Sequence, residues 1–163
     1  MNLARTLLPV SILLAAAPAR AQLSNRFLRV EAGVLAPLDG AGDPTPSLAV
    51  AAGLWLGGDL DLVARVAWAS RSRTPGREAD GALLPSVGLR WCPGSSSVRP
   101  EVHAEVGWTE PVGLAGGGLF AGMGLGLEVF PARDLSLGIG AALRAGAVPG
   151  TSAEIGISGT AYF

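Results

Sequence analysis

The chain has 163 residues, of which 49% are apolar and only 15% are charged, and its formal net charge at pH 7 is −1. Typical soluble domains carry about 25% charged residues, so this composition is too apolar for an ordinary solvated surface. A net charge this close to zero also argues against nucleic acid as a partner. The length suits a single domain.

The first 21 residues have the parts of an export signal. Arg5 supplies a positive start, residues 7–17 form an apolar stretch, and residues 19–21 form a small-x-small cleavage site. The apolar stretch is far shorter than the ~20 residues that a helix needs to cross a bilayer. We therefore expect a cleaved signal peptide at residues 1–21 and one domain at residues 22–163.

After the signal, apolar residues recur at every second position, which is the side-chain period of a β-strand. The predicted strands cover residues 27–36, 48–56, 60–70, 83–92, 98–108, 119–130, 135–144 and 153–163. Tight turns rich in Gly, Pro, Ser and Asp are expected at residues 57–59, 93–97 and 131–134. Longer connections are expected at residues 37–47, 72–82, 109–118 and 145–152. Short turns at one end and longer loops at the other are typical of outer-membrane barrels.

The charged side chains of these segments all lie on one parity, and the other parity is almost purely apolar. Residues 98–108 show the alternation most clearly. Such a sheet has one apolar face and one charged face. The residues predicted on the charged face are Arg29, Glu31, Asp61, Arg65, Arg90, Arg99, Glu101, His103, Glu105, Glu128, Arg144 and Glu154.

Parity alone does not say which face points inward, because a soluble barrel with an apolar interior has the same pattern. Trp68, Trp91 and Trp108 lie on the apolar parity at strand ends, where the aromatic girdle of a membrane barrel is found, and Phe163 extends this girdle. Glycines crowd the charged parity, where they leave room for long side chains inside a narrow barrel. The sequence therefore favours an all-β, eight-stranded, antiparallel up-and-down barrel that spans a membrane; a soluble barrel that binds an apolar ligand is the alternative.

The last strand carries a resemblance to known proteins. Ile155, Ile157 and the terminal Phe163 alternate as in the C-terminal strand of bacterial outer-membrane proteins, although Gly159 stands where a larger apolar residue is usual. The domain resembles the eight-stranded class that includes the OmpA transmembrane domain, OmpX and OmpW. This resemblance implies the cell outer membrane, insertion by the barrel-assembly machinery, and lipid and lipopolysaccharide as surroundings. With both termini on the short-turn side, that side is expected to be periplasmic; we also expect a monomer.

Arg71 continues the charged parity, so six arginines stand against six carboxylates. Buried charges are tolerated when paired, which predicts a lumen filled by Arg–carboxylate pairs. A narrow channel for small solutes is the alternative. Arg71, Arg73 and Arg77 could contact lipopolysaccharide phosphates, or could be ordinary solvated loop charge.

His103 lies between two glutamates of its own strand and could act as a general base or a metal ligand. Neither a second histidine nor a nearby cysteine supports a metal site, and no serine has a base at a recognisable spacing. We expect His103 to be a hydrogen-bonded lumen residue, and we expect no cofactor and no catalysis. Cys92, the single cysteine, is expected to be buried and free.

Overall fold

The computed structural model describes residues 26–40, 43–70, 73–74, 77–78, 81–112, 116–146 and 150–163. The predicted signal peptide at residues 1–21 lies outside the described residues. Within the described part of the chain, no helix is long and apolar enough to cross a membrane.

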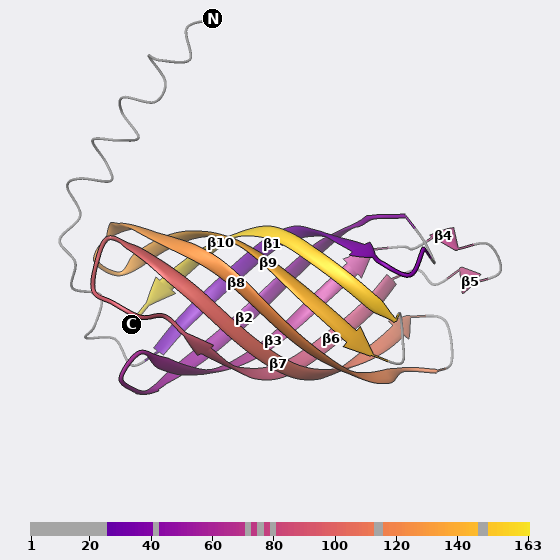
Figure 1. Cartoon of the computed structure of the whole chain (residues 1–163), viewed down its shortest axis with the longest axis horizontal. Coiled ribbons are helices and arrows are strands. Elements are labelled where there is room, and N and C mark those ends of the chain that lie inside the picture. The colour runs from indigo at the N-terminus through magenta and orange to yellow at the C-terminus, as the bar shows by residue number, and fades with distance from the viewer. Residues whose placement is uncertain are drawn as a thin grey trace, which may run out of the picture.

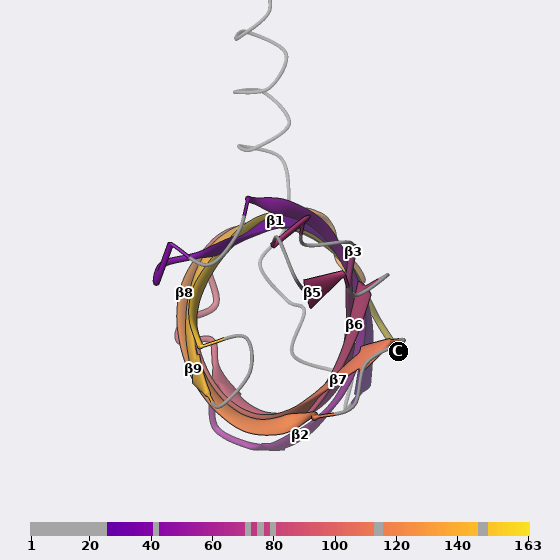
Figure 2. The same ribbon diagram turned by 90° about the vertical axis from the view of Figure 1, so that its right-hand side faces the viewer.

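Eight antiparallel strands close into one barrel (Figures 1 and 2). They are β1 (Arg26–Pro37), β2 (Thr45–Gly57), β3 (Leu60–Ser70), β6 (Gly81–Trp91), β7 (Val98–Val112), β8 (Gly118–Ala132), β9 (Leu135–Gly146) and β10 (Thr151–Tyr162). Each strand pairs with its neighbour in the sequence, and β1 also pairs with β10 to close the ring. The predicted eight-stranded up-and-down barrel is confirmed.

The two ends of the barrel differ in their connections. Tight turns join β2 to β3 and β8 to β9 at one end, which also holds residues 26 and 163 and the short segment between β6 and β7. We call this the turn end. The other four connections lie at the opposite, loop end. There, β4 (Arg73–Thr74) and β5 (Arg77–Glu78) form a small ladder beyond the barrel, which the sequence did not predict (Figure 1).

The strands extend beyond their predicted bounds, mainly toward the loop end. β7 continues to Val112, although the apolar alternation that predicted it stops at Trp108. Backbone hydrogen bonds continue the ladder there without an apolar face, as the pairing of Thr109 with Gly118 shows. Residues 84 and 85 are missing from the β6–β7 ladder, which is consistent with the lack of an N–H group in Pro85.

The barrel exposes its apolar face and buries its charged face. Leu119 and Ile157 are 69% and 65% exposed, whereas Arg90 and Glu128 are 3% and 0% exposed. A soluble barrel needs the reverse arrangement, so that alternative is wrong. Ordinary water-soluble proteins do not expose an apolar surface that runs around the whole molecule.

One residue departs from the predicted alternation. Trp55 follows Ala51 and Gly53 on the charged, inward parity of residues 48–56, which predicts an inward side chain, but it is 47% exposed. The register shifts between Trp55 and Gly57, just before the turn, and the indole Nε1 donates to the carbonyl oxygen of Gly58 at 2.8 Å. Gly58 has a φ of 60°, a left-handed conformation that suits glycine. The turn therefore displaces the side chain that a strict alternation would place inside.

Candidate functional site in the barrel lumen

The lumen holds one connected system of buried side chains. The part of this system nearest the turn end centres on Glu128. The carboxylate of Glu128 accepts hydrogen bonds from Tyr162 Oη at 2.9 Å and Ser136 Oγ at 3.1 Å. It also accepts from Arg90 Nη1 at 3.2 Å and Thr160 Oγ1 at 3.3 Å. These donors from three strands, β6, β9 and β10, hold one fully buried carboxylate, which satisfies a group that would otherwise be costly to bury.

Two arginines link this carboxylate to the rest of the turn-end region. Arg90 donates to Asp61 Oδ2 from Nη2 at 2.8 Å and from Nε at 3.0 Å. Arg29 donates to both carboxylate oxygens of Glu101, at 2.9 and 2.8 Å. Because β1 and β7 lie on opposite sides of the ring, the pair of Arg29 and Glu101 crosses the whole lumen. Bidentate pairs of this kind fix geometry as well as charge.

A second set of ion pairs lies closer to the loop end. Arg65 donates to Glu31 at 2.8 Å and to Glu154 at 3.0 Å. Arg144 donates to Glu105 and to Glu154, each at 2.6 Å. Glu154 therefore joins the two arginines. The only ion-pair distance between this set and the turn-end set, among the described residues, is 3.7 Å from Arg29 Nε to Glu31 Oε1.

The predicted balance of six arginines against six carboxylates is not what the described residues show. Arg29, Arg65, Arg90 and Arg144 contact the six carboxylates. Arg99 contacts no carboxylate among the described residues; its guanidinium lies 4.5 Å from the centroid of the Phe130 ring and its Nε donates to the Ser96 carbonyl at 3.3 Å. Arg71 lies outside the described residues. The paired network thus contains more carboxylates than arginines.

The aromatic residues of the turn end were missed by the sequence reasoning. Phe27 lies over Gly53, where an added Cβ would come within 2.1 Å of two ring carbons, and the guanidinium of Arg90 lies 4.1 Å from the Phe27 ring centroid. Tyr162 is 5.9 Å from Phe27 and 5.6 Å from Phe130, between ring centroids. Their position on the inward parity could have predicted them, but the prediction of lumen residues used only charged side chains.

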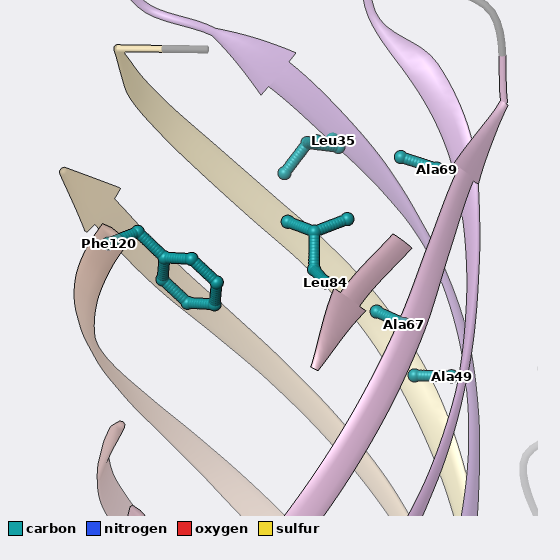
Figure 3. Close-up of a cluster of buried hydrophobic side chains, with 6 residues drawn as sticks. All are labelled: Leu35, Ala49, Ala67, Ala69, Leu84 and Phe120. Atoms are coloured by element: carbon teal, nitrogen blue, oxygen red, sulfur yellow. The ribbon is translucent and has the colours of Figure 1, made fainter. Parts of the chain in front are cut away.

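The loop end of the lumen combines apolar and hydroxyl side chains. A cluster of buried apolar side chains lies there (Figure 3), and Thr45, Ser47, Thr109 and Ser152 are buried on the inward parity at the same end. The members of the apolar cluster are Leu35, Ala49, Ala67, Ala69, Leu84 and Phe120. Each lies on the inward parity of its strand, toward the loop end. We call these six residues the loop-end cluster.

Between the two ends lies a cavity of about 90 Å³. Arginine and glutamate side chains of both sets line it, together with Ser86, His103 and Ser158. Gly140 and Gly156 line it, and they are paired in register with each other, with Gly126 on β8 and with Gly33 on β1. This row of glycines adds no side chains to the wall of the lumen.

His103 lines the cavity and has limited contacts. Its Nδ1 is 3.5 Å from Glu101 Oε1, and the imidazole lies over Gly124, where an added Cβ would be 2.4 Å from His103 Cε1. In the described part of the chain, neither a serine nor a cysteine pairs with the imidazole. This geometry is that of a lumen hydrogen-bonding residue.

One group of lumen side chains has the residue types of a metal site, but positively charged arginines lie beside it. Ligand atoms of Cys92, Glu101 and Glu128 lie within 4.8 Å of one another. Arg29 and Arg90 already contact both carboxylates, and burial raises the pKa of the Cys92 thiol to about 12. A protonated thiol beside two guanidinium groups is a poor cation site. Cys92 is buried and free, as predicted.

The four aromatic residues of the predicted girdle lie at the two rims of the barrel. Trp68 and Trp108 are exposed near the loop end, and Trp91 and Phe163 are exposed near the turn end. Trp55 adds an aromatic side chain at the turn end. Ile155 and Ile157 of the predicted assembly signal face outward on β10.

Comparisons with known structures identify the fold as that of small eight-stranded membrane barrels. The chain is similar to the crystal structure of Neisserial surface protein A, with a TM-score of 0.71 and 14% identity over 86% of this chain and 98% of that one. It is similar to the N-terminal barrel domain of OprF from Pseudomonas aeruginosa, with a TM-score of 0.57 and 16% identity over 84% and 98% of the two chains. A de novo designed transmembrane β-barrel matches with a TM-score of 0.52 and 16% identity over 85% and 98%. No protein-family model matches the sequence, and the search of curated proteins finds no match.

Proposed function

We propose that the chain is an integral outer-membrane barrel of structural or interaction type whose lumen is closed to ions. The observation that supports this most directly is the inverted burial: an apolar surface surrounds the barrel and a buried ion-pair network fills it. An apolar band flanked by aromatic side chains matches the hydrocarbon layer and its two interfaces.

The turn end is periplasmic in this proposal and the loop end faces outward. Short periplasmic turns and longer outer loops are the usual arrangement, and the turns here are short at the end that holds both described termini. Residues 1–21 act as the export signal, and Ile155, Ile157 and Phe163 are read by the barrel-assembly machinery. Lipid and lipopolysaccharide surround a monomer that has no cofactor. The contact of Arg71, Arg73 and Arg77 with lipopolysaccharide phosphates stays a prediction, because the side chains of these three residues lie outside the described part of the structure.

The placement is tested by fractionation. Outer membranes washed with urea are run on gels with and without boiling, and the band of the unboiled protein is expected to migrate differently because a closed barrel resists detergent. Recovery in the soluble periplasm, without a heat-dependent shift, would overturn the placement.

The closed lumen is tested by conductance. Purified protein in planar bilayers is expected to give no steady conductance steps, with a known porin as the positive control. The second candidate function, a narrow channel for small solutes, is favoured by the central cavity. Steady steps from the unmodified protein would establish the channel and overturn the closed lumen.

A further inference from the structure

Two arginines lie at the turn-end rim, on either side of the end of β10. Arg26 begins β1, and its carbonyl oxygen accepts a hydrogen bond from the N–H of Phe163 at 3.0 Å. Arg133 lies in the turn between β8 and β9, beside Asp134, whose carbonyl oxygen accepts from the N–H of Tyr162 at 2.9 Å. These are the two exposed arginines among the residues whose side chains the structure describes.

Both guanidinium groups are without a carboxylate partner. Within the described part of the chain, no ion pair includes Arg26 or Arg133, nor the carboxylates of Asp134 and Phe163. Phe27 is buried in the lumen, so the alternation of β1 directs the Arg26 side chain to the outer surface. Two guanidinium groups at the edge of an apolar surface suit the phosphate of a lipid headgroup.

The apolar surface beside these arginines has a depression on β10. Gly159 lies on the outward parity, and its neighbours Val30, Leu137 and Ile157 are all strongly exposed. A Cβ added at Gly159 would meet no other side chain or strand, and its backbone is not left-handed. Neither packing nor backbone conformation therefore requires glycine here. Glycine within a strand often marks the close approach of another molecule.

The depression and the arginines form one surface. Ala161 is the next outward residue after Gly159, and it is paired with Leu28, which follows Arg26 on the outer face of β1. The depression therefore leads from Gly159 to the rim at Phe163. At about 3.3 Å per residue it is roughly 13 Å long, close to half of the ~25 Å apolar band. That is the depth of one leaflet, so the depression suits one acyl chain.

Tryptophan does not anchor this part of the rim. The four tryptophans of the chain lie on β2, β3, β6 and β7, which are neighbours in the ring. Strands β8, β9, β10 and β1 carry none. Interfacial tryptophan usually holds a membrane protein at the level of the lipid headgroups. On the half of the barrel without it, Arg26 and Arg133 are the side chains that can contact headgroups at the turn end.

We propose that the outer surface at the turn end of β9, β10 and β1 binds one glycerophospholipid. Arg26 and Arg133 bind its phosphate group. One of its acyl chains lies over Gly159 and Ala161, toward the middle of the membrane. This inference rests on the membrane placement proposed above, in which the turn end is periplasmic, and it adds a specific lipid partner in the leaflet on that side.

The test measures the lipid that stays bound to the protein. The full chain in detergent micelles is mixed with equal amounts of phosphatidylglycerol and of diacylglycerol with the same acyl chains, and bound lipid is counted by native mass spectrometry. Arg26→Gln and Arg133→Gln are compared with Ser95→Glu, which changes the charge equally on the opposite side of the turn end. Gly159→Leu is compared with Ala104→Leu, which enlarges a small outward residue of β7.

Phosphatidylglycerol is expected to be retained in preference to diacylglycerol. Each arginine variant is expected to lower that retention about fivefold, which is the usual contribution of one basic residue near a lipid surface. Gly159→Leu is expected to lower it about fourfold, because the acyl chain loses contact with the depression. Ser95→Glu and Ala104→Leu are expected to leave it unchanged. The inference is overturned if both lipids are retained equally, or if either control lowers retention as much as its matched variant.

A second copy of the chain is the other possible occupant of the depression. A dimer that Gly159→Leu dissociates would show this and overturn the lipid site. Each variant is first checked for the heat-dependent gel shift, and Gly159→Val replaces Gly159→Leu if the latter does not fold. Recovery in the soluble periplasm without that shift would overturn the membrane placement, whereas a membrane barrel that retains no phosphatidylglycerol would overturn only the lipid site.

Discussion

Strands β8 to β10 and strands β1, β3, β6 and β7 build two parts of the wall of the same lumen in different ways. The inner face of β8 and β9 is mainly glycine at mid-height, and its outer face carries Met123, Leu125, Leu137 and Ile139, all strongly exposed. The inner faces of β1, β3, β6 and β7 carry most of the charged groups.

The difference shows how a narrow barrel accommodates long side chains. Long guanidinium and carboxylate side chains need volume inside the lumen, and glycine on neighbouring strands provides that volume. Arg29 illustrates this point, because its Nη2 lies 3.3 Å from the position that a Cβ at Gly138 would take. One wall supplies the charge, and the other supplies the room and the bulky outward surface.

The largest expected effect comes from the charged wall. Arg90→Met removes one of the donors to Glu128 and leaves the buried Asp61 carboxylate without its ion-pair partner. We expect a loss of about 3–5 kcal/mol in the free energy of unfolding. Urea unfolding of the lipid-reconstituted barrel, followed by tryptophan fluorescence, measures it. A loss under about 1 kcal/mol would mean that the network is not a main source of stability.

A smaller effect is expected on the outer surface of the glycine wall. Ile139→Arg puts a charge near the middle of β9, on the lipid side, and should cost about 2–4 kcal/mol. Leu135→Arg, at the turn-end rim of the same strand, is the matched control and should cost about 0–1 kcal/mol. Equal costs in the same unfolding assay would contradict the position assigned to the lipid layer.

Two lumen-facing glycines differ in the space beside them. At Gly53 the Phe27 ring occupies the position of a side chain, whereas Gly140 lines the cavity. Gly53→Ala collides with the Phe27 ring and should cost about 1–3 kcal/mol. Gly140→Ala lines the cavity, with its nearest contact at 3.3 Å, and should change stability by less than about 0.5 kcal/mol. Phe27→Leu combined with Gly53→Ala is expected to be less destabilised than the sum of the single variants. Similar costs at both glycines would show that the wall does not enclose free volume.

The smallest expected effect is at Cys92. Burial raises the pKa of its thiol to about 12, so the thiol stays protonated at pH 8. The folded protein is expected to give no adduct with iodoacetamide at pH 8, and the urea-unfolded protein is expected to react fully. Rapid labelling of the folded barrel would show that the turn end opens.

The strands and their two faces could be predicted because the two-residue period is a property of the extended backbone. The pairing across the lumen could not. Arg29 and Glu101 meet because of the register in which the barrel closes, and alternation within single strands carries no information about that register. The same holds for the row of four glycines across β1, β10, β9 and β8, which forms only in that register.

The loop-end cluster was missed for a different reason. Leu35, Leu84 and Phe120 are single apolar residues on the charged parity of three strands, and each looks like an exception when its strand is read alone. Trp55 was misplaced because the register shift before Gly57 interrupts the alternation.

The pair of Arg29 and Glu101 also bears on the order of events in folding. The two strands that carry it are on opposite sides of the ring, so the pair cannot form while the sheet is still open. Until β1 meets β10, the charged face remains in contact with water and neither group is desolvated. Ring closure then removes these charges from water and brings them together in one step. A partly formed sheet therefore gains little from its charged residues, and closure is the event that commits the chain to its final structure.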